Sequence, residues 1–288
     1  MRQVKHCDLH CHSVFSDGSN TPKELLTLAG EKELFAIALC DHNTISGLYE
    51  MEKCAKELNQ NVILSSELTC EYNGKEIHMQ CMFIDLNHTQ GIENYINNIR
   101  HIKRERNIDM SRRLIADGYN VSLEELENRF GNNINRAHFA LKLVEMGVLN
   151  TVSEGFETLL KEGGKYYKPD KRPEALELIS SIVSWGCVPV LAHPLLSLDR
   201  DELEEFLSKA KGVGLVGMEV YYPKFSKEQT EYLKTLAKRF DLIPSGGSDY
   251  HGSVKANIAL GSASVPYSCY EELLKASIKI KQKQNLGH

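Results

Sequence analysis

Short apolar runs alternate with segments of helical periodicity along most of this chain. Residues 35–40 and 187–192 are continuous apolar runs, which are typical of strands buried on both faces of a parallel sheet. After the first of these runs, Leu48, Met51 and Ala55 recur at the spacing of one helix face. This alternation predicts an α/β fold with a largely parallel sheet.

Seven runs are predicted as strands. They are residues 4–9, 35–40, 62–64, 77–84, 187–192, 215–221 and 242–245. The fourth follows Asn73-Gly74, a dipeptide typical of a tight hairpin turn. Helices are predicted after most of the others, and the first of them opens with a capping box at Thr21 and Glu24. Seven strands with intervening helices predict a parallel barrel, with an open doubly wound sheet as the alternative.

The pattern changes between residues 91 and 168, where the sequence predicts helices and no strong strand. We therefore expect three segments: residues 1–90 as the first part of the barrel, 91–168 as a small helical insertion, and 169–288 as the second part. Basic residues from Arg100 to Arg113 lie early in the insertion. Because Glu105 and Asp109 are interleaved with them, a solvated helix face is expected, with nucleic-acid contact as the alternative.

Composition excludes several classes of protein. The 288 residues are 42% hydrophobic and 25% charged, as in ordinary globular proteins. A formal charge of −5 argues against a generally basic, nucleic-acid-binding surface. No apolar run approaches the roughly 18 residues of a membrane span, and the first residues carry no apolar signal segment. We expect a cytoplasmic protein with no membrane partner, whose eight cysteines, without a CxxC pair, are reduced.

Histidines and carboxylates gather near the ends of the predicted strands. Nine candidate ligands are distributed in this way: His10, His12, Asp17, His42, Glu67, His78, His193, Asp249 and His251. Because the carboxyl ends of barrel strands share one rim, residues distant in sequence are expected to converge there. A catalytic zinc ion uses about three protein ligands, so nine are too many for one ion. The set predicts two or three ions with Glu67 able to bridge, and mixed imidazole and carboxylate donors suit Zn²⁺, Mn²⁺ or Fe.

One such histidine alone would more often be an ordinary polar residue. The prediction of a metal centre therefore depends on the repetition of the pattern at successive strands. Asp8 and Asp41 neighbour candidate ligands, and we expect them either to orient those ligands or to stabilise a turn.

Five stretches of the sequence together resemble the motifs of a known family. They read DLHCHSVFSDGSNTP from Asp8, LCDHNTISG from Leu39, SSEL from Ser65, AHP from Ala192 and GGSDYH from Gly246. As a set they are similar to the motifs of the PHP (polymerase and histidinol phosphatase) family of metal-dependent phosphoesterases. The resemblance implies a distorted (β/α)7 TIM-like barrel with a centre of three divalent metal ions.

The resemblance also distributes the candidate ligands among the ions. It implies one ion held by His10, His12, Glu67 and Asp249, a second by Glu67, His78 and His193, and a third by Asp17, His42 and His251. Four of these residues are expected to be catalytic as well: Asp17, Glu67, His193 and Asp249. Mn²⁺ is the preferred ion, with Zn²⁺ or Fe²⁺ as alternatives.

The helical insertion resembles the substrate-binding cap of PHP phosphoesterases that act on nucleotides. Arg136 and His138 look like the Arg-x-His element that holds phosphate in that branch. A guanidinium fork and an imidazole donor suit a phosphate dianion. Lys168 is a further expected phosphate contact, with a solvated face as the alternative. Asp170 departs from the histidine of many relatives, which leaves the substrate open.

These resemblances imply hydrolysis of a phosphate ester by a metal-bound hydroxide. The expected partner is a small phosphorylated substrate, above all a nucleoside 3′,5′-bisphosphate that loses its 3′-phosphate. Alternatives are a 5′-3′ exonuclease on short RNA and a phosphoesterase of cyclic sugar phosphates or histidinol phosphate. A C–N amidohydrolase is a competing class, although it does not need Asp17, His42 and His251. A non-enzymatic nucleic-acid-binding module is a third hypothesis, and the oligomeric state is not predicted.

Overall fold

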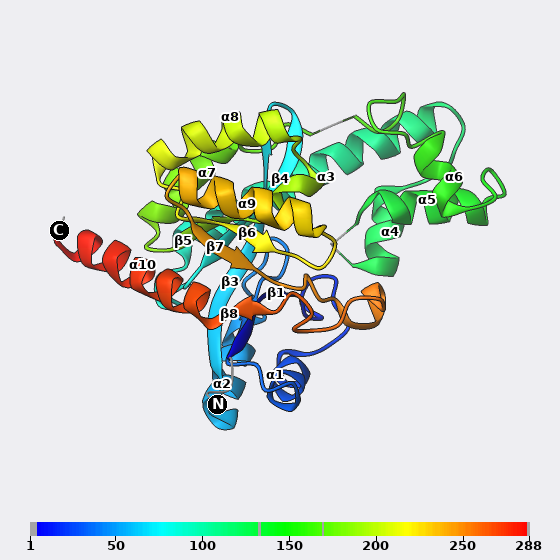
Figure 1. Cartoon of the computed structure of the whole chain (residues 1–288). Helices are drawn as coiled ribbons and strands as arrows, with labels where there is room; N and C mark the ends of the chain where they lie inside the picture. Colours follow the sequence, from blue (N-terminus) through cyan, green and yellow to red (C-terminus); the bar gives the residue numbers. More distant parts are fainter. Residues whose placement is uncertain (1–4, 132–133, 169, 287–288) are drawn as a thin grey trace. The chain divides into compact units, whose positions relative to one another are not determined.

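The computed structural model describes residues 5–131, 134–168 and 170–286, which form two compact units. The barrel unit comprises the chain up to Ile96 and from Pro173 onward, and the helical unit comprises Asn97–Arg172. Helix α3 (Gln90–Ala116) begins in the barrel unit and continues into the helical unit (Figure 1). The functional division predicted from the sequence, with residues 91–168 as a substrate-binding cap, stays a prediction.

In the described residues of the barrel unit, one sheet of eight strands forms the centre, in the order β7-β6-β5-β4-β3-β2-β1-β8. The strands are β1 (His6–Cys11), β2 (Ala36–Leu39), β3 (Asn61–Tyr72), β4 (Lys75–Met82), β5 (Val188–Leu191), β6 (Gly217–Tyr221), β7 (Ile243–Gly246) and β8 (Val265–Pro266). Neighbours are parallel from β1 to β3 and from β5 to β7. Strand β4 is antiparallel to both of its neighbours, and β8 is antiparallel to β1. The sheet is therefore mixed.

The sheet nearly closes into a barrel where β1 meets the chain that follows β7. The backbone N–H of Asp249 donates to the carbonyl of His10 at 2.9 Å, and that of His12 donates to the carbonyl of Tyr250 at 2.9 Å. Gly247 lies so close to the backbone and Cβ of His10 that a side chain there would collide with them. The predicted α/β barrel is confirmed, and it contains one strand more than the sequence predicts.

The structure differs from the predicted strands at β3 and β8. Strand β3 runs to Tyr72, well beyond the predicted residues 62–64, because its first part pairs with β2 and its second part pairs with β4. Glu67 consequently lies within a strand and not after one. The additional strand is β8, whose two residues pair with His6 and Cys7 of β1. Two residues are too few for a hydrophobic period to reveal them.

Helices pack on the strands of the barrel unit (Figure 1). They are α1 (Pro22–Glu31), α2 (Leu48–Leu58), α7 (Ala175–Ser184), α8 (Arg200–Ala210), α9 (Lys227–Arg239) and α10 (Tyr267–Leu286), with the short η1 (Pro194–Leu196), η2 (Lys211–Val213) and η3 (Gly252–Lys255). The capping box predicted at Thr21 and Glu24 is present at the start of α1. Alternate residues of β2 belong to different apolar clusters, Ala36 to one and Ile37 to the other. Both faces of this strand are therefore buried, as its continuous apolar run predicts.

The helical unit has an apolar core of its own, to which Leu114, Phe139 and Leu143 contribute fully buried side chains. Besides the end of α3, it contains α4 (Leu123–Phe130), α5 (Arg136–Glu145) and α6 (Val152–Glu157). Its described residues form no strand. In the described parts of both units, no helix is long and apolar enough to cross a membrane.

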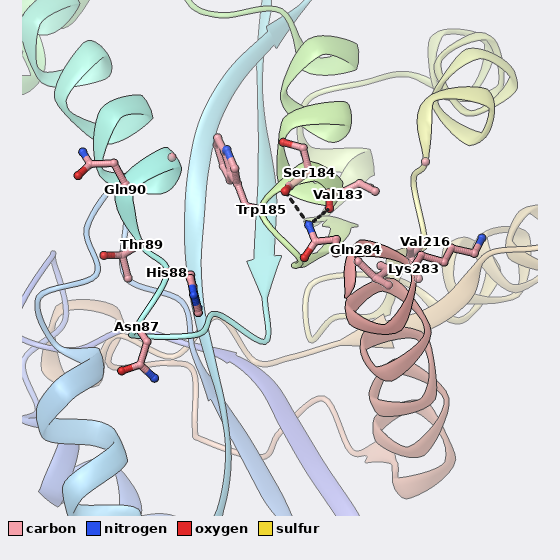
Figure 2. A pocket seen from close by; sticks show the side chains of 13 residues that line it. Asn87, His88, Thr89, Gln90, Val183, Ser184, Trp185, Val216, Lys283 and Gln284 are labelled. Carbon is pink, nitrogen blue, oxygen red and sulfur yellow. Dashed lines mark hydrogen bonds between the residues drawn. The ribbon is translucent and has the colours of Figure 1, made fainter. Parts of the chain in front are cut away.

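A pocket of about 1020 Å³ lies at the end of the barrel where β5 and β6 begin (Figure 2). Trp185, Val216 and Gln284 contribute to its walls. The Gln284 amide donates to the carbonyl oxygens of Val183 and Ser184 at 3.2 and 2.6 Å. None of the nine candidate ligands lines this pocket, because they lie toward the opposite end of the parallel strands.

Candidate metal centre

The structure brings the nine candidate ligands together at one end of the barrel unit. They come from β1 and the loop after it (His10, His12, Asp17), from the chain after β2 (His42), from β3 and β4 (Glu67, His78), and from the chain after β5 (His193) and β7 (Asp249, His251). Seven of them form three groups whose donor atoms lie within 4.8 Å of one another: His12, Asp17, His42 and His251; His10, His12 and Glu67; and His42, Glu67 and His78. The other two contact these groups, His193 at Glu67 and Asp249 at His12. His12, His42 and Glu67 each belong to two of the groups, so the three groups form one continuous cluster in which Glu67 is the shared carboxylate.

The carboxylate of Glu67 is fully buried and faces five imidazoles. Its Oε1 lies 2.9 Å from His78 Nδ1 and 2.8 Å from His193 Nε2. Its Oε2 lies 3.1 Å from His10 Nε2, 3.4 Å from His12 Nε2 and 3.2 Å from His42 Nδ1. The two oxygens thus face different sets of imidazoles, which is the arrangement that a bridging carboxylate requires.

A second group surrounds Asp17 in the loop after β1. Asp17 Oδ1 lies 3.2 Å from His251 Nε2 and 3.7 Å from His12 Nδ1, and Oδ2 lies 3.9 Å from His42 Nε2. The Asp17 side chain is 52% exposed, whereas His12 and His251 are fully buried. This group therefore forms the open side of the cluster, where a substrate can approach.

Buried nitrogen atoms without hydrogen bonds test whether the cluster fits metal ions. Nδ1 of His12 and Nε2 of His251 are buried and make no hydrogen bond within the described part of the chain, although both face Asp17. Nδ1 of His251 lies 2.8 Å from the carbonyl oxygen of Asp249, so this nitrogen carries the proton and leaves a lone pair on Nε2. Unpaired buried polar atoms are costly, and imidazole and carboxylate donors are ligands of divalent transition metals. The cluster fits such ions.

The carboxylates strongly affect the protonation of the imidazoles around them. Burial lowers the pKa of His10, but Glu219 and Glu67 outweigh burial and hold that pKa well above its usual value. Burial likewise lowers the pKa of His78, and Glu67 more than offsets the effect and raises it to about 10. His12 has weaker compensation, and burial lowers its pKa to about 3. Without ions, protons on His10 and His78 therefore neutralise Glu67, and metal binding has to displace them.

Glu219 is a buried carboxylate that the sequence analysis misses. It lies in β6 with no exposed surface, and its Oε1 is 2.8 Å from His10 Nδ1. Its Oε2 accepts from the backbone N–H of His193 at 2.7 Å, and Gln80 Nε2 donates to Oε1 at 3.1 Å. A carboxylate behind a histidine fixes the tautomer and leaves the other ring nitrogen for a metal. A single acid within the apolar run of residues 215–221 was the available signal, because isolated buried charges are rare.

Asp249 connects the cluster to two further residues that the sequence analysis misses. Its Oδ1 faces His12 Nε2 at 3.2 Å and His251 Nδ1 at 3.4 Å. Its Oδ2 accepts from the hydroxyl of Tyr222 at 3.0 Å and from Nζ of Lys255 at 2.9 Å. The carboxylate therefore separates the imidazoles on one side from a phenol and an ammonium group on the other.

The two aspartates that neighbour candidate ligands hold loops in place. Asp41 accepts from the backbone N–H of Ser13 at 2.7 Å and from the Ser16 hydroxyl at 2.6 Å, which fixes the loop that carries Asp17. Asp8 accepts from the backbone N–H of Ser248 at 2.8 Å and so fixes the residue before Asp249. Both aspartates act on the loops that carry the ligands, because among the described residues neither carboxylate bonds to an imidazole ring.

Two candidate ligands have backbone conformations that L-residues rarely adopt. The φ angle is +25° at His193 and +55° at Asp249. Such conformations cost about 1–3 kcal/mol each and persist where the surrounding structure enforces them. The hydrogen bonds from His193 N–H to Glu219 and from Asp249 N–H to the His10 carbonyl supply this enforcement.

The three predicted phosphate contacts lie in the helical unit. Arg136 begins α5, its guanidinium lies 4.6 Å from the ring centres of Phe156 and Tyr167, and it donates to the carbonyl of Leu160 at 3.3 Å. His138 Nδ1 accepts from the backbone N–H of Asn135 at 3.1 Å, so Nε2 carries the proton, and it has no hydrogen-bond partner among the described residues. Lys168 is exposed. Their role in binding phosphate stays a prediction.

Asp170, the expected point of departure from relatives, is nearly buried between two arginines of the helical unit. It pairs with Arg106 at 2.7 Å and with Arg172 at 3.0 Å. Arg106 also donates to the hydroxyl of Tyr167 at 3.0 Å and lies 5.0 Å from the centre of its ring. Since Tyr167 stacks on Arg136 as well, Asp170 helps to fix the surroundings of that guanidinium.

Comparison with known proteins decides the family. The profile of the PHP domain matches residues 8–183, which is more than half of the chain. The chain belongs to the PHP family. The chain is a metal-dependent phosphoesterase of this family, and the relatives described next are phosphoesterases as well.

The relatives of this PHP phosphoesterase differ in their substrates. A 5′-3′ exoribonuclease of Haemophilus influenzae is 29% identical over 249 residues, which cover 86% of this chain and 90% of that protein. A 3′,5′-nucleoside bisphosphate phosphatase of Chromobacterium violaceum is 27% identical over 253 residues, which cover 86% and 88%. The solved structure of a candidate metal-dependent phosphoesterase from Bifidobacterium adolescentis has a TM-score of 0.75 at 29% identity, with 94% and 96% coverage.

Proposed function

We propose that this PHP phosphoesterase removes the 3′-phosphate from nucleoside 3′,5′-bisphosphates. The proposal includes three divalent ions, with Mn²⁺ preferred, held by the nine candidate ligands as the family motifs distribute them. The observation that carries it is the group of five imidazoles around the two oxygens of Glu67, beside a second group around Asp17. Two metals need fewer ligands than this, so the second group supports a third ion.

The side chains divide the work of such a reaction. Bound divalent ions would supply Lewis acidity at the phosphoryl oxygens and lower the pKa of water. Asp17, Glu67, His193 and Asp249 are assigned to hold those ions. Arg136 offers N–H donors to a phosphate, and its two flanking rings orient it. His138 offers its Nε2–H, and because burial lowers its pKa the ring donates as a neutral imidazole at pH 7.

Ion pairs between arginines and carboxylates in the helical unit favour a nucleotide over a long RNA as the substrate. Arg104 pairs with Glu127 at 3.0 Å, and both Arg112 and Arg113 pair with Asp109 at 2.5 and 2.6 Å. Binding of single strands relies on a basic groove that follows the backbone, often with exposed aromatic platforms. Arginines that are already paired with carboxylates form a poor groove of this kind. The exoribonuclease among the relatives nevertheless makes 5′-3′ cleavage of short RNA the second candidate function.

A substrate panel with measured ion content tests the proposal. The purified protein is stripped with chelator, reloaded with Mn²⁺, Zn²⁺ or Fe²⁺, and analysed for metal per chain. Adenosine 3′,5′-bisphosphate, adenosine 3′-monophosphate and a 5′-phosphorylated RNA pentamer are then compared by release of phosphate and nucleotides. We expect close to three ions and phosphate release from the bisphosphate that leaves the 5′-monophosphate. Mononucleotides from the pentamer with an untouched bisphosphate would favour the exonuclease, and Asp249→Asn serves as the inactive control.

A further inference from the structure

We propose that Lys255 is a phosphate-binding residue of the metal centre, whose ammonium group contacts a phosphoryl oxygen while it stays bonded to Asp249. The inference rests on the proposed phosphoesterase function and extends it to a residue outside the nine candidate ligands. Lys255 Nζ lies 2.9 Å from Asp249 Oδ2, and the opposite oxygen of that carboxylate lies 3.2 Å from His12 Nε2. The ammonium group is thus one carboxylate away from the imidazoles that would hold the ions.

The ammonium group of Lys255 has more N–H donors than its contact with Asp249 uses. An ammonium group carries three N–H donors, and within the described part of the chain Asp249 is its one side-chain partner. Its side chain is 34% exposed, so the remaining donors are accessible from solvent. Among the described lysines and arginines of the barrel unit, it is also the one that contacts a candidate ligand. Among the described cations of this unit, Lys255 is therefore the one placed to meet a phosphate dianion at the cluster.

The position of Asp249 does not require this lysine. The hydroxyl of Tyr222 donates to the same Oδ2 at 3.0 Å, and Tyr222 is only 4% exposed. A buried neutral donor is sufficient to orient a carboxylate, whereas a flexible and partly exposed lysine adds little to orientation. A compact ammonium charge is instead a common ligand of phosphate groups.

The backbone beneath Lys255 is fastened to the loop that carries Asp17. The backbone N–H of Ser253 donates to the Ser19 hydroxyl at 2.8 Å, and the N–H of Ser19 donates to the carbonyl of His251 at 3.1 Å. Gly252, with φ at +67°, lies so close to Ser19 that no side chain would fit between them. The lysine therefore extends from a fixed backbone to its contact with Asp249.

Binding of inorganic phosphate to the Mn²⁺-loaded protein tests this proposal apart from turnover. Titration calorimetry compares the parent protein with Lys255→Met, Lys255→Arg, Tyr222→Phe and Lys283→Met, and elemental analysis verifies the ion content of each. Lys283→Met removes the same charge from the pocket at the other end of the barrel and controls for long-range electrostatics. Tyr222→Phe removes the other donor to Oδ2 without removing a charge.

We expect Lys255→Met to weaken phosphate binding by about tenfold or more with unchanged ion content, because it loses a charge-assisted hydrogen bond. Lys255→Arg, Tyr222→Phe and Lys283→Met should stay within about threefold of the parent. Phosphate binding by Lys255→Met at the parent's affinity would overturn the proposal, as would an equal loss in Tyr222→Phe or a loss of ions in Lys255→Met. Failure of the phosphoesterase function itself would appear differently, as a parent protein that binds no ions and no phosphate.

Discussion

Replacement of Glu67 by glutamine is the most direct test of the bridging role. The substitution keeps the shape of the side chain and removes its charge, so the barrel should still fold around it. In the parent protein both oxygens face imidazole nitrogens at 2.8–3.4 Å, and the side chain is fully buried. A glutamine would keep one oxygen and present an NH₂ group in place of the other, so one of the two sets of imidazoles would lose its acceptor.

The expected loss of metal affinity in Glu67→Gln follows from the burial of the Glu67 carboxylate. Removal of one partner from a buried ion pair costs about 3–5 kcal/mol. Since about 1.4 kcal/mol corresponds to a factor of ten, binding of the ions that share Glu67 should weaken by roughly a hundred- to several-thousand-fold. At free Mn²⁺ about ten times above the parent's dissociation constant, the variant should lose at least one ion per chain. Turnover should fall with it to background.

The assay measures ion content, unfolding temperature and phosphate release on the same preparations. Glu219→Gln is the matched control, because Glu219 is equally buried and lies 2.8 Å from His10 Nδ1, on the side away from Glu67. Substitution of a residue behind a ligand costs about 10- to 100-fold in metal affinity or activity. This control should therefore keep its ions at saturating Mn²⁺ and lose activity only within that range.

Two outcomes would refute the reasoning. A Glu67→Gln protein that retains the parent's ion content and turnover would show that Glu67 bridges nothing. Equal losses of ions in Glu67→Gln and Glu219→Gln would show that the centre needs buried negative charge in general, and that the position of Glu67 between the imidazoles is unimportant.

Three further predictions concern other parts of the molecule. The metal-free protein should lose stability as pH rises from about 6.5 to about 10, because folding raises the pKa of His78 to about 10, so its stabilisation is complete below the unfolded pKa and is lost as pH rises through the folded pKa. Thermal unfolding with chelator should show this decline, and Mn²⁺-loaded protein should not. Gly247→Ala should destabilise the fold by about 1–3 kcal/mol, because its Cβ would collide with His10 at the closure of the barrel, and a urea midpoint equal to the parent's would contradict this. Arg136→Lys should raise KM for a nucleotide substrate by about tenfold with unchanged ion content, because it keeps the charge and loses the planar fork; steady-state kinetics with an unaltered KM would exclude Arg136 from the substrate site.

Much of the fold is predictable because strands buried on both faces have continuous apolar runs. This signal finds β2 and β5 in nearly their observed positions. It fails for β3, whose second part contains Ser65, Ser66 and Glu67 and shows no continuous apolar run. That part is a strand because β4 pairs with it after the hairpin, and pairing with a partner is not encoded in the strand's own composition.

The candidate ligands are predictable for a different reason than the residues that hold them. Histidines and carboxylates at successive strand ends are an unusual pattern, so they can be recognised from the sequence. Glu219, Tyr222 and Lys255 are single residues in unremarkable surroundings, and their roles arise only from what lies opposite them. The roles of Asp8 and Asp41 are partly predictable. Their positions beside candidate ligands can be recognised in the sequence, but their hydrogen bonds to the loops of Ser248 and Ser13 cannot.

The same backbone hydrogen bonds close the barrel and bring the metal centre together. His10 and His12 reach Asp249 because β1 bonds to the chain after β7, across about 240 residues of sequence. The same hydrogen bonds hold Asp249 in its left-handed conformation, so the folded barrel maintains the strain and the strained residue faces the imidazoles. Ions that bind this cluster would therefore bind the closed barrel and not the open chain. By mass action, bound ions must then stabilise the contact between β1 and the chain after β7. Conversely, a change that loosens this contact must lower the affinity of the cluster for the ions.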